Sequence, residues 1–452
     1  MLKNILILGA GKSSFYLINY LLSQAEQNQW HITVGDLDLR QAEKKINNHP
    51  CGTAIRFDIY REKDRQENID TADIVVSLLP PPFHILVAQA CLDANAHLVT
   101  ASYLTDETRA LDAAFKAKNL LFMGEIGLDP GIDHLAIMEI LDRLREKNYK
   151  IRSVHSHTGA LIAPECDTNP WHYKFSWAPM NVVTAGQGVS QYLDNNTLKR
   201  IPYQRLFDSC LHRNVEGVGD IEIYANRNSL AYIKLYSLEG VDSLLRGTIR
   251  WADYCEAWQA LVTLGLTDNS YKIDCTDLRI GDWVKSYVPT EFLQEDVHLD
   301  LAVADFLGLP LSHKVIYQLK WLGLFSDDKI PTTHATASPA EILCAILSEK
   351  WVLQPNDKDF ILMLHEIIYE TEEGKYLLQS SMNCIGEDSE HTAIAKTVGL
   401  PCGIFVKLLA NNEISLRGVH APVSAEVYKP VLAELAEYGI SFSENIAPTE
   451  FI

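Results

Sequence analysis

The stretch NILILGAGKSSFYLINYLL, Asn4 to Leu22, combines three signals in a fixed order. Its apolar run, Ile5 to Leu8, predicts a buried strand, and the glycines that follow predict a tight turn. Apolar residues at helical spacing come next and predict a helix with one buried face. A strand, a glycine turn and a helix in this order are typical of the opening of a dinucleotide-binding domain.

The turn between Gly9 and Ser14 is expected to hold a pyrophosphate. Gly9 permits the turn, Gly11 lets the backbone approach the ligand, and the free N–H groups at the helix start favour negative charge. Ser14 stands where a third glycine or an alanine is usual. A glycine turn in some other α/β protein is the alternative interpretation of the same residues.

Asp36 ends the next predicted strand, about 20 residues beyond the turn, where a carboxylate can accept hydrogen bonds from both ribose hydroxyls. The same carboxylate would repel a 2′-phosphate, so Asp36 favours NAD over NADP. Arg40 follows closely and could tolerate a phosphate. NADP therefore stays open as the alternative cofactor.

Further strands are predicted near Ile55, Val75, Val99 and Phe122, with helical patterns between them. The fold class is α/β, and residues 1–125 are expected to form an N-terminal Rossmann domain with a doubly wound parallel sheet. Ligands of such sheets bind at the carboxyl ends of the strands. A nicotinamide and a substrate are thus expected near Asp58, Ser77, Leu78, Ser102 and Tyr103, although Ser77 alone is more typical of a helix cap.

Composition and charge exclude several classes of partner. The formal net charge of −20 disfavours nucleic acids and anionic membranes, because phosphate binding needs clustered Lys and Arg. The nine cysteines form no CxxC pair and no charged and apolar leader precedes the first strand, which favours a reducing, cytoplasmic location. The apolar runs are strand-sized, well short of the roughly 20 residues that span a bilayer.

The stretch GEIGLDPGIDHL, Gly124 to Leu135, follows the last predicted strand of the first domain. Glycine and proline fix an unusual backbone path there, and DPGID predicts a helix that begins near Gly131. An Asp before Pro-Gly is a turn residue in most proteins. The turn alone does not explain why acids and a histidine gather at this corner.

The remaining chain predicts a second α/β domain with a mixed sheet, built from residues 126–252 and 355–410. Residues 253–354 show helical patterns and are expected to form a helical insertion. FILMLHEIIYET and KYLLQSSMNC predict a hairpin, and GLP is expected to stop a helix at Gly399. Residues 411–452 are expected to be helices that return towards the first domain.

Six motifs carry a family resemblance. GLDPGIDH after TASY, then GALIAPE, NPWHYKFSW, YANRNSL, LLRGTIRW and AKTVGLP, in this order, resemble the saccharopine dehydrogenases of the glutamate-forming type. The resemblance covers nearly the whole chain. It implies an oxidoreductase acting on a CH–NH group, which interconverts L-saccharopine with L-glutamate and 2-aminoadipate 6-semialdehyde in the aminoadipate route of lysine metabolism, using NAD or NADP. It also implies a small-molecule substrate and a homodimer.

Saccharopine carries three carboxylates, so its pocket should contain guanidinium groups, which pair with carboxylates in a bidentate manner. The resemblance associates Arg227 and Arg246 with these carboxylates. It associates Lys174 with them less firmly. Arg250 is expected in a surface ion pair. The expected substrate-binding residues are Ser102, Tyr103, Asp129, Lys174, Phe175, Arg227, Arg246, Gly247 and Thr248.

Hydride leaves the carbon attached to the secondary amine, and water then hydrolyses the imine, so the reaction needs a proton acceptor and a group that steers water. The resemblance implies Asp129 and Tyr103 beside the reacting centre. Thr158 stands where many relatives have a cysteine, and its hydroxyl is too weakly acidic to replace a thiol, although it can bind a carboxylate. His157 or His134 could transfer the proton. Alternatively, His157 could lie on a strand and face away from the site, and His134 could cap a helix.

The cofactor site is expected to combine the turn, the strand ends and the GLDPG corner, and no residue is assigned to a metal. The expected cofactor-binding residues are Gly9, Gly11, Lys12, Ser13, Ser14, Asp36, Asp58, Ser77, Leu78, Ser102, Gly127, Leu128, Asp129 and Gly131.

Two alternatives remain. A carboxynorspermidine or homospermidine type dehydrogenase would share the glycine turn and the coupling of an amine to a carbonyl, but it would need fewer cations than Arg227 and Arg246 supply. A non-catalytic dinucleotide-binding protein would be consistent with Ser14 and Thr158.

Overall fold

The computed structural model describes residues 2–450. The chain divides into two compact units. The first unit runs to Ile151 and includes Tyr369–Thr449, and the second unit is Arg152–Ile368. The chain leaves the first unit within β7 (Lys150–Ile162) and returns to it within β15 (Asp359–Thr371).

The first unit is built on a parallel sheet with the strand order β17-β6-β5-β4-β1-β2-β3, in which every pair is parallel. This order confirms the predicted doubly wound Rossmann sheet. β4 and β6 are buried along their whole length, as expected for parallel strands covered on both faces. The strands are β1 (Lys3–Leu8), β2 (Trp30–Asp36), β3 (Gly52–Arg56), β4 (Ile74–Ser77), β5 (His97–Thr100), β6 (Leu121–Met123) and β17 (Gly418–His420).

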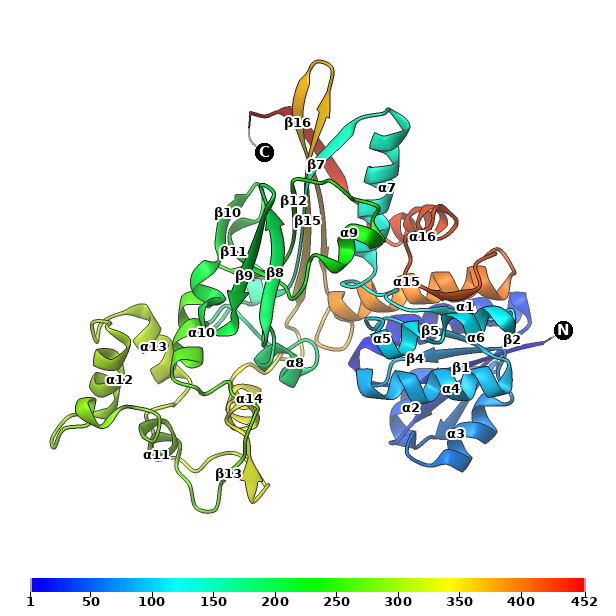
Figure 1. Ribbon diagram of the computed structural model, residues 1–452. Helices are drawn as coiled ribbons and strands as arrows, with labels where there is room; N and C mark the ends of the chain where they lie inside the picture. Colours follow the sequence, from blue (N-terminus) through cyan, green and yellow to red (C-terminus); the bar gives the residue numbers. More distant parts are fainter. Residues whose placement is uncertain (1, 451–452) are drawn as a thin grey trace. The chain divides into compact units, whose positions relative to one another are not determined.

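Helices connect these strands and pack along the sheet (Figure 1). They are η1 (Lys12–Ser14), α1 (Phe15–Asn28), α2 (Leu39–Ile46), α3 (Glu62–Ile69), η2 (Pro81–Phe83), α4 (His84–Ala94), α5 (Asp106–Arg109), α6 (Asp112–Ala117), α7 (Ile132–Glu146), α15 (Ala393–Ala410) and α16 (Ala425–Glu437).

The C-terminal segment lies in the first unit, where β17 extends the sheet by pairing Gly418 with Leu121. α16 packs on α7, and β18 (Ser443–Pro448) pairs with β16 (Gly374–Ile385) in antiparallel fashion. The sequence analysis expected only helices here, whereas the segment forms a strand, a helix and a second strand. α7 and α15 also belong to the first unit rather than to the second domain expected from the sequence.

The expectation that GLP stops a helix at Gly399 is wrong, because α15 continues through Pro401 to Ala410. Proline removes one backbone hydrogen bond, but α15 is almost entirely buried and packs tightly on α1. A Cβ on Gly399 would lie 2.8 Å from the backbone nitrogen of Leu17. Tertiary packing therefore outweighs the local stop signal. α15 is also the one helix in the described residues that is long and apolar enough to cross a membrane, although most of it is buried inside the structure.

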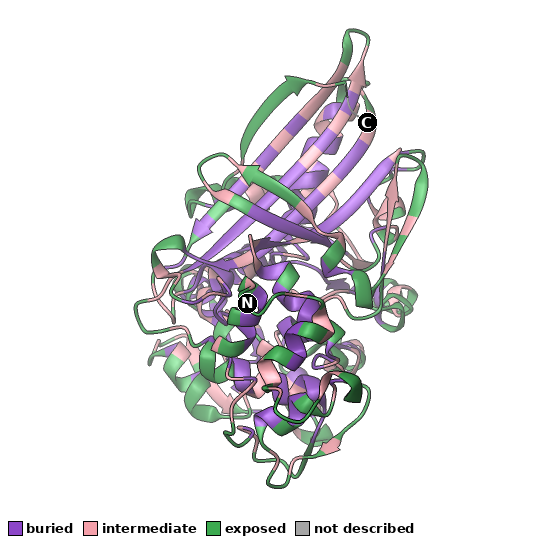
Figure 2. Cartoon of the chain, turned by 90° about the vertical axis from the view of Figure 1, so that its left-hand side faces the viewer, coloured by how far each residue is buried: buried purple, intermediate pink, exposed green. Residues whose placement is uncertain are grey.

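The second unit contains a mixed sheet with the strand order β10-β11-β12-β7-β15. β11 pairs with β10 and with β12 in antiparallel fashion, and β12 pairs with β7 in parallel, so the sheet is mixed, as the sequence predicted. Figure 2 shows buried residues along the strands and exposed residues at many of the turns. The further strands are β8 (Val189–Asp194), β9 (Thr197–Pro202), β10 (Leu211–Val215), β11 (Gly219–Ala225), β12 (Ser243–Trp251), β13 (Ile273–Asp274) and β14 (Thr336–Ala337).

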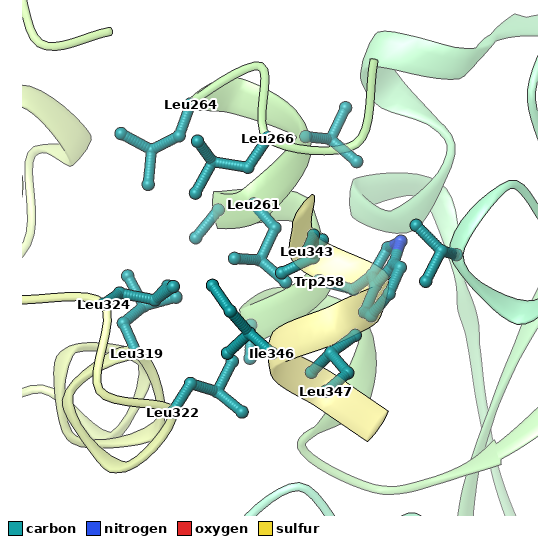
Figure 3. Close-up of a cluster of buried hydrophobic side chains, with 14 of the residues drawn as sticks. Trp258, Leu261, Leu264, Leu266, Leu319, Leu322, Leu324, Leu343, Ile346 and Leu347 are labelled. Carbon is teal, nitrogen blue, oxygen red and sulfur yellow. The ribbon is translucent and has the colours of Figure 1, made fainter. Parts of the chain in front are cut away.

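The predicted helical segment, residues 253–354, shares one apolar core with residues next to the sheet, such as Trp171 and Tyr224. Leucines from α10, α13 and α14 belong to this core, and those of α14 lie near Trp258 (Figure 3). The helices are η3 (Pro164–Cys166), α8 (Pro179–Val183), η4 (Tyr203–Arg205), η5 (Phe207–Ser209), α9 (Ala231–Leu235), α10 (Tyr254–Thr263), α11 (Ile280–Lys285), η6 (Thr290–Phe292), α12 (Leu299–Leu307), α13 (Lys314–Trp321) and α14 (Pro339–Lys350).

The contact between α15 and α1 gives a stability prediction. Alanine at Gly399 would gain about 1 kcal/mol of helix propensity, but its Cβ would push against backbone, and overpacking of this kind costs about 1–3 kcal/mol. We therefore expect Gly399→Ala to lower the midpoint of urea unfolding. Gly403→Ala tests the same helix contact at a second point, because its Cβ would lie 2.8 Å from the buried ring of Tyr20, and it should also lower the midpoint. A Gly399→Ala protein more stable than the wild type would contradict this packing.

Candidate functional site

The glycine turn after β1 has the geometry of a phosphate-binding turn. Gly9 has a φ of +105°, and a Cβ there would lie 3.3 Å from the backbone of Leu78. A Cβ on Gly11 would meet nothing within 4 Å, so the turn faces open space. The Ser14 hydroxyl donates to the Gly11 carbonyl at 2.8 Å and closes the turn. Gly11, Lys12 and Ser13 therefore fit a dinucleotide pyrophosphate, and Ser14 holds the turn from behind.

Asp36 lies directly beside this turn, at the end of β2. One carboxylate oxygen accepts the Ala10 N–H at 2.7 Å, and the other accepts the Asp38 N–H at 2.9 Å. The residue is only partly buried, while Arg40 is exposed. Asp36 is thus fixed by backbone donors where a ribose hydroxyl can reach it.

A buried histidine joins the ends of β4 and β5. Its Nδ1 lies 3.0 Å from the Ser77 hydroxyl, and its Nε2 lies 2.8 Å from the Ser102 hydroxyl. This residue, His84, has a pKa lowered to about 4 by burial, so it is neutral at pH 7. His84 is not among the residues predicted from the sequence, although its position in the helix after a strand end was a usable signal. The Ser77 hydroxyl therefore belongs to the hydrogen-bond network of His84.

Asp58 and Leu78 lie in loops of the same unit. Asp58 accepts the Tyr60 N–H at 3.0 Å, after the end of β3. The Leu78 N–H donates to the Leu8 carbonyl at 2.8 Å, which places its backbone against the glycine turn.

The corner after β6 brings the two expected catalytic residues together. The Tyr103 hydroxyl donates to Oδ1 of Asp129 at 2.9 Å. Both side chains are partly exposed, whereas nearly all of the corner around Asp129 is buried. Tyr103 follows β5 and Asp129 follows β6, so the pair lies beyond the carboxyl end of the parallel sheet.

Two glycines close the loop that carries Asp129. The Gly127 N–H donates to the Pro130 carbonyl at 2.9 Å, and the Ile132 N–H donates to the Gly127 carbonyl at 2.9 Å. Gly131 has a φ of +151°, and a Cβ there would lie 2.0 Å from the Gly127 oxygen. No side chain fits at Gly131, so the glycines of this corner are required by its backbone path. Leu128 fills the loop as a buried side chain.

The acid and histidine that remained unexplained in this corner form a buried pair. Nε2 of His134 lies 3.0 Å from Glu125, which also accepts from the Leu104 N–H and from Arg109, each at 3.0 Å. Burial alone would raise the pKa of Glu125, but the hydrogen bond and charge of His134 and the other donors lower it. His134 therefore belongs to a buried network. At the start of the helix, the Asp133 carboxylate accepts the Gly131 N–H at 2.6 Å.

In the second unit, three of the expected residues share one face of the mixed sheet. In the parallel pairing of β12 with β7, Arg246 lies opposite Ser156, and Thr248 lies opposite Thr158. Side chains at paired positions and at every second residue share a face. Arg246, Thr248 and Thr158 therefore project from the same side.

Arg246 is 4% exposed, and its guanidinium lies 4.2 Å from the centre of the Tyr232 ring. Arg227 follows β11, is exposed and has a φ of +50°. The Asn226 N–H donates to the Arg246 carbonyl at 2.8 Å, so the two arginines lie on neighbouring segments. The Thr158 hydroxyl is buried without a hydrogen-bond partner in the described residues. An acceptor such as a carboxylate would satisfy it.

His157 projects from the opposite face of this sheet. It pairs with Gly247, where a Cβ would lie 2.5 Å from Nδ1 of His157. Burial lowers the pKa of His157 well below its usual value. Adjacent in the chain, Thr158 and His157 therefore cannot act at one point.

Lys174 and Phe175 take part in the packing of the second unit. Nζ of Lys174, which is 5% exposed, lies 2.7 Å from the Asp357 carboxylate. Phe175 lies 5.2 Å from Trp351, ring centre to ring centre. Both side chains contact partners within this unit.

The expectation of a surface ion pair for Arg250 is wrong. Arg250 is 3% exposed, and its guanidinium lies 5.2 to 5.6 Å from three tyrosine rings. It also donates to the Tyr224 hydroxyl at 3.1 Å. A guanidinium group can be buried when it stacks on aromatic rings, and this site supplies three such rings. The rings belong to Tyr173, Tyr224 and Tyr254.

Comparisons with known proteins agree with this arrangement. Residues 5–123 match the model of the saccharopine dehydrogenase NADP binding domain, and residues 127–440 match that of the saccharopine dehydrogenase C-terminal domain. The first unit thus carries a nicotinamide dinucleotide-binding domain.

Two curated relatives match almost the whole chain. The saccharopine dehydrogenase [NADP(+), L-glutamate-forming] of Schizosaccharomyces pombe is 29% identical, over 99% of this chain and 100% of its own. The mitochondrial alpha-aminoadipic semialdehyde synthase of Bos taurus is 31% identical over 98% of this chain. The chain spans about half the length of that relative, 47%.

Solved structures show the same fold. The apo saccharopine dehydrogenase (L-Glu forming) of Saccharomyces cerevisiae has a TM-score of 0.87 at 27% identity and covers 98% of this chain and 100% of its own. The homospermidine synthase of Legionella pneumophila has a TM-score of 0.53 at 9% identity, over 99% of this chain and 92% of its own, which shows a shared fold alone. Because the C-terminal family model alone covers more than half of it, the chain belongs to the saccharopine dehydrogenase family.

Proposed function

We propose that the protein is an NAD(P)-dependent saccharopine dehydrogenase, which cleaves L-saccharopine oxidatively to L-glutamate and 2-aminoadipate 6-semialdehyde, or catalyses the reverse reaction, in the aminoadipate route of lysine metabolism. The observation that carries the proposal is the hydrogen bond between Tyr103 and Asp129 beyond the carboxyl end of the dinucleotide-binding sheet. Ligands of open α/β sheets bind at that end.

Asp129 supplies the proton acceptor in this proposal. A nicotinamide, when bound at this end of the sheet, would supply the hydride acceptor. Before that transfer, the substrate amine has to lose a proton, which a partly exposed carboxylate can accept. Tyr103 donates to that carboxylate and holds its orientation, and its hydroxyl can position water for hydrolysis of the imine.

Arg246 supplies the main carboxylate ligand of the second unit. Its burial makes an ion pair with a substrate carboxylate stronger than at an exposed site. Thr248 and Thr158 project from the same face, and their hydroxyls can donate to carboxylate oxygens. Arg227, which is exposed on the neighbouring segment, is proposed as a second cation.

Several expected residues receive supporting roles. Lys174, paired with Asp357, and Phe175, packed on Trp351, are proposed to hold the substrate-binding segment in place. Gly247 is proposed to keep the sheet open beside His157, because a side chain there would clash with the ring.

For the cofactor, we propose a preference for NAD. The support is Asp36, whose carboxylate lies 2.7 Å from the Ala10 nitrogen of the glycine turn and would repel a 2′-phosphate. The relatives named for NADP(+) and the NADP binding domain support the alternative, with Arg40 as the phosphate ligand.

We also propose a cytoplasmic homodimer. All nine cysteines are free, which is consistent with a reducing compartment. The dimer is suggested by the family resemblance.

The role of Asp129 is tested by its substitution with asparagine. Asp129→Asn removes the proton acceptor but keeps the side-chain size, so we expect kcat for NADH or NADPH formation from saccharopine to fall by about 100- to 10,000-fold. Binding of the dinucleotide, followed by its fluorescence, should persist. Asp93→Asn is the matched control, because Asp93 lies at an exposed position of α4.

The same assay separates the alternatives. Wild-type protein that binds the dinucleotide but releases no glutamate would support a non-catalytic protein, and turnover of a diamine without saccharopine turnover would support a homospermidine-type enzyme. Unchanged kcat in Asp129→Asn would remove the proton-transfer role.

The role of Arg246 is tested by Arg246→Met. Loss of a charge-assisted hydrogen bond of about 1.5–3 kcal/mol predicts a rise of roughly 10- to 100-fold in KM for saccharopine. The KM for the dinucleotide should change little. Arg200→Met, at an exposed position of β9, is the control. Equal KM values for saccharopine in the Arg246 variant and the wild type would contradict the carboxylate contact.

The cofactor preference is tested by Asp36→Ser. Removal of the carboxylate removes repulsion of the 2′-phosphate, so the ratio of kcat/KM for NAD to that for NADP should fall by roughly tenfold or more. Asp38→Ser is the control, because Asp38 caps α2. A ratio that is unchanged in Asp36→Ser would contradict the role given to this carboxylate.

A further inference from the structure

A cluster of metal-ligand side chains lies in the second unit, on the sheet face opposite to Arg246. His155 and His157 are two residues apart on β7 and share a face, and Glu366 comes from the neighbouring strand β15. One potential ligand atom from each lies within 4.8 Å of the other two. Two rigid neighbouring strands therefore present two imidazoles and one carboxylate at one point.

His157 supplies a second, independent observation. It is 1% exposed, and neither of its ring nitrogens has a hydrogen-bond partner in residues 2–450. A buried polar group without a partner costs about 1–3 kcal/mol, and native proteins rarely leave one unexplained. An ion that accepts the lone pair of one ring nitrogen would satisfy that nitrogen.

We propose that His155, His157 and Glu366 bind a divalent transition-metal ion of the zinc class. Imidazole and carboxylate together suit zinc, and three protein ligands leave one position for water. Magnesium and calcium prefer sites built only of oxygen ligands.

The geometry needs only local adjustment. Around tetrahedral zinc, neighbouring ligand atoms lie about 3.3 Å apart, so atoms now within 4.8 Å have to close slightly. His155 and Glu366 are partly exposed, which gives their side chains room to move and gives the ion a path from solvent.

The charges around the cluster are compatible with a cation. Glu366 and Asp194 supply negative charge near His155, and Arg213 supplies positive charge. Arg213 is exposed, so solvent screens it more than the groups at the cluster. Burial lowers the pKa of both histidines and keeps the rings neutral, which is the form that binds metals.

The consequence for the fold is a cross-link between β7 and β15. The ion would fix the His157 ring against Gly247, where there is room for no side chain. β7 also carries Thr158 on its other face, so the metal would stabilise the strand that supplies this hydroxyl. His157 is then a structural ligand rather than a proton donor, and the metal site does not depend on the proposed function.

A second group, Cys210, His212 and Glu222, has ligand atoms at similar spacing. The Glu222 carboxylate already accepts the Asp253 N–H at 3.1 Å and the Cys255 N–H at 2.7 Å. The His212 side chain is 73% exposed. We do not assign a metal to this group, and it provides the control for the test.

The test uses the full chain, freed of metal by a chelator and titrated with Zn²⁺ against a chromophoric competitor. We expect one ion per chain and a higher melting temperature with zinc. Glu366→Gln and His155→Ala should each weaken binding by about tenfold or more. Cys210→Ser should bind as the wild type does. Equal melting temperatures of the metal-free wild type and Glu366→Gln would show that this variant still folds.

Cobalt distinguishes the two groups, because thiolate ligands give an intense near-ultraviolet charge-transfer band and imidazole and carboxylate ligands do not. We expect no such band. The proposal is overturned if the wild type binds no stoichiometric zinc, or if Glu366→Gln and His155→Ala bind zinc as the wild type does. A thiolate band that Cys210→Ser abolishes would also overturn it.

Discussion

The backbone closure between Gly127 and Gly131 is the constraint on which the proposed catalytic centre depends. The Gly127 carbonyl accepts the Ile132 N–H, and a Cβ on Gly131 would overlap Gly127 itself. The loop can close only with glycine at this point, and its closure holds Asp129 at the end of the parallel sheet. Tyr103, from the end of the neighbouring strand, then reaches the carboxylate at 2.9 Å. Because a proton acceptor has to be held within hydrogen-bond reach of its substrate, the rigidity of this loop is part of the chemistry.

In the second unit, the strand register determines from which face of the sheet each candidate side chain projects. The pairing of Gly247 with His157 and of Thr248 with Thr158 assigns these residues to opposite faces of one sheet. A shift of β7 by one residue would exchange the faces of its side chains and place His157 beside Thr248. Register therefore separates a polar face suited to carboxylates from a face with histidine and glutamate ligands. Thr158 and His157, although adjacent in the chain, therefore have different surroundings.

The sequence predicted the Rossmann strands well, because buried parallel strands are short, apolar and regularly spaced. The family resemblance implied that Tyr103 and Asp129 lie beside one centre, and the structure joins them by a hydrogen bond beyond the edge at which their strands end. Prediction from the sequence failed where long-range contacts override local signals. Packing on α1 carries α15 through Pro401, and three tyrosines from separate segments bury Arg250. The pairs of His84 with Ser102 and of His134 with Glu125 join residues that are 18 and 9 positions apart and belong to different elements, so local periodicity alone did not reveal them.

The threonine at position 158 bears on how the proposed reaction can proceed. A hydroxyl of ordinary acidity cannot replace a thiol in proton transfer, but the proposed proton acceptor, Asp129 held by Tyr103, lies in the first unit and does not depend on residue 158. Position 158 then needs only a hydrogen-bond donor on the sheet face that carries Arg246 and Thr248. The buried Thr158 hydroxyl, beside Thr248 and without a partner of its own in the described chain, meets that need. The departure at Thr158 is thus compatible with catalysis, because binding and proton transfer rest on different residues.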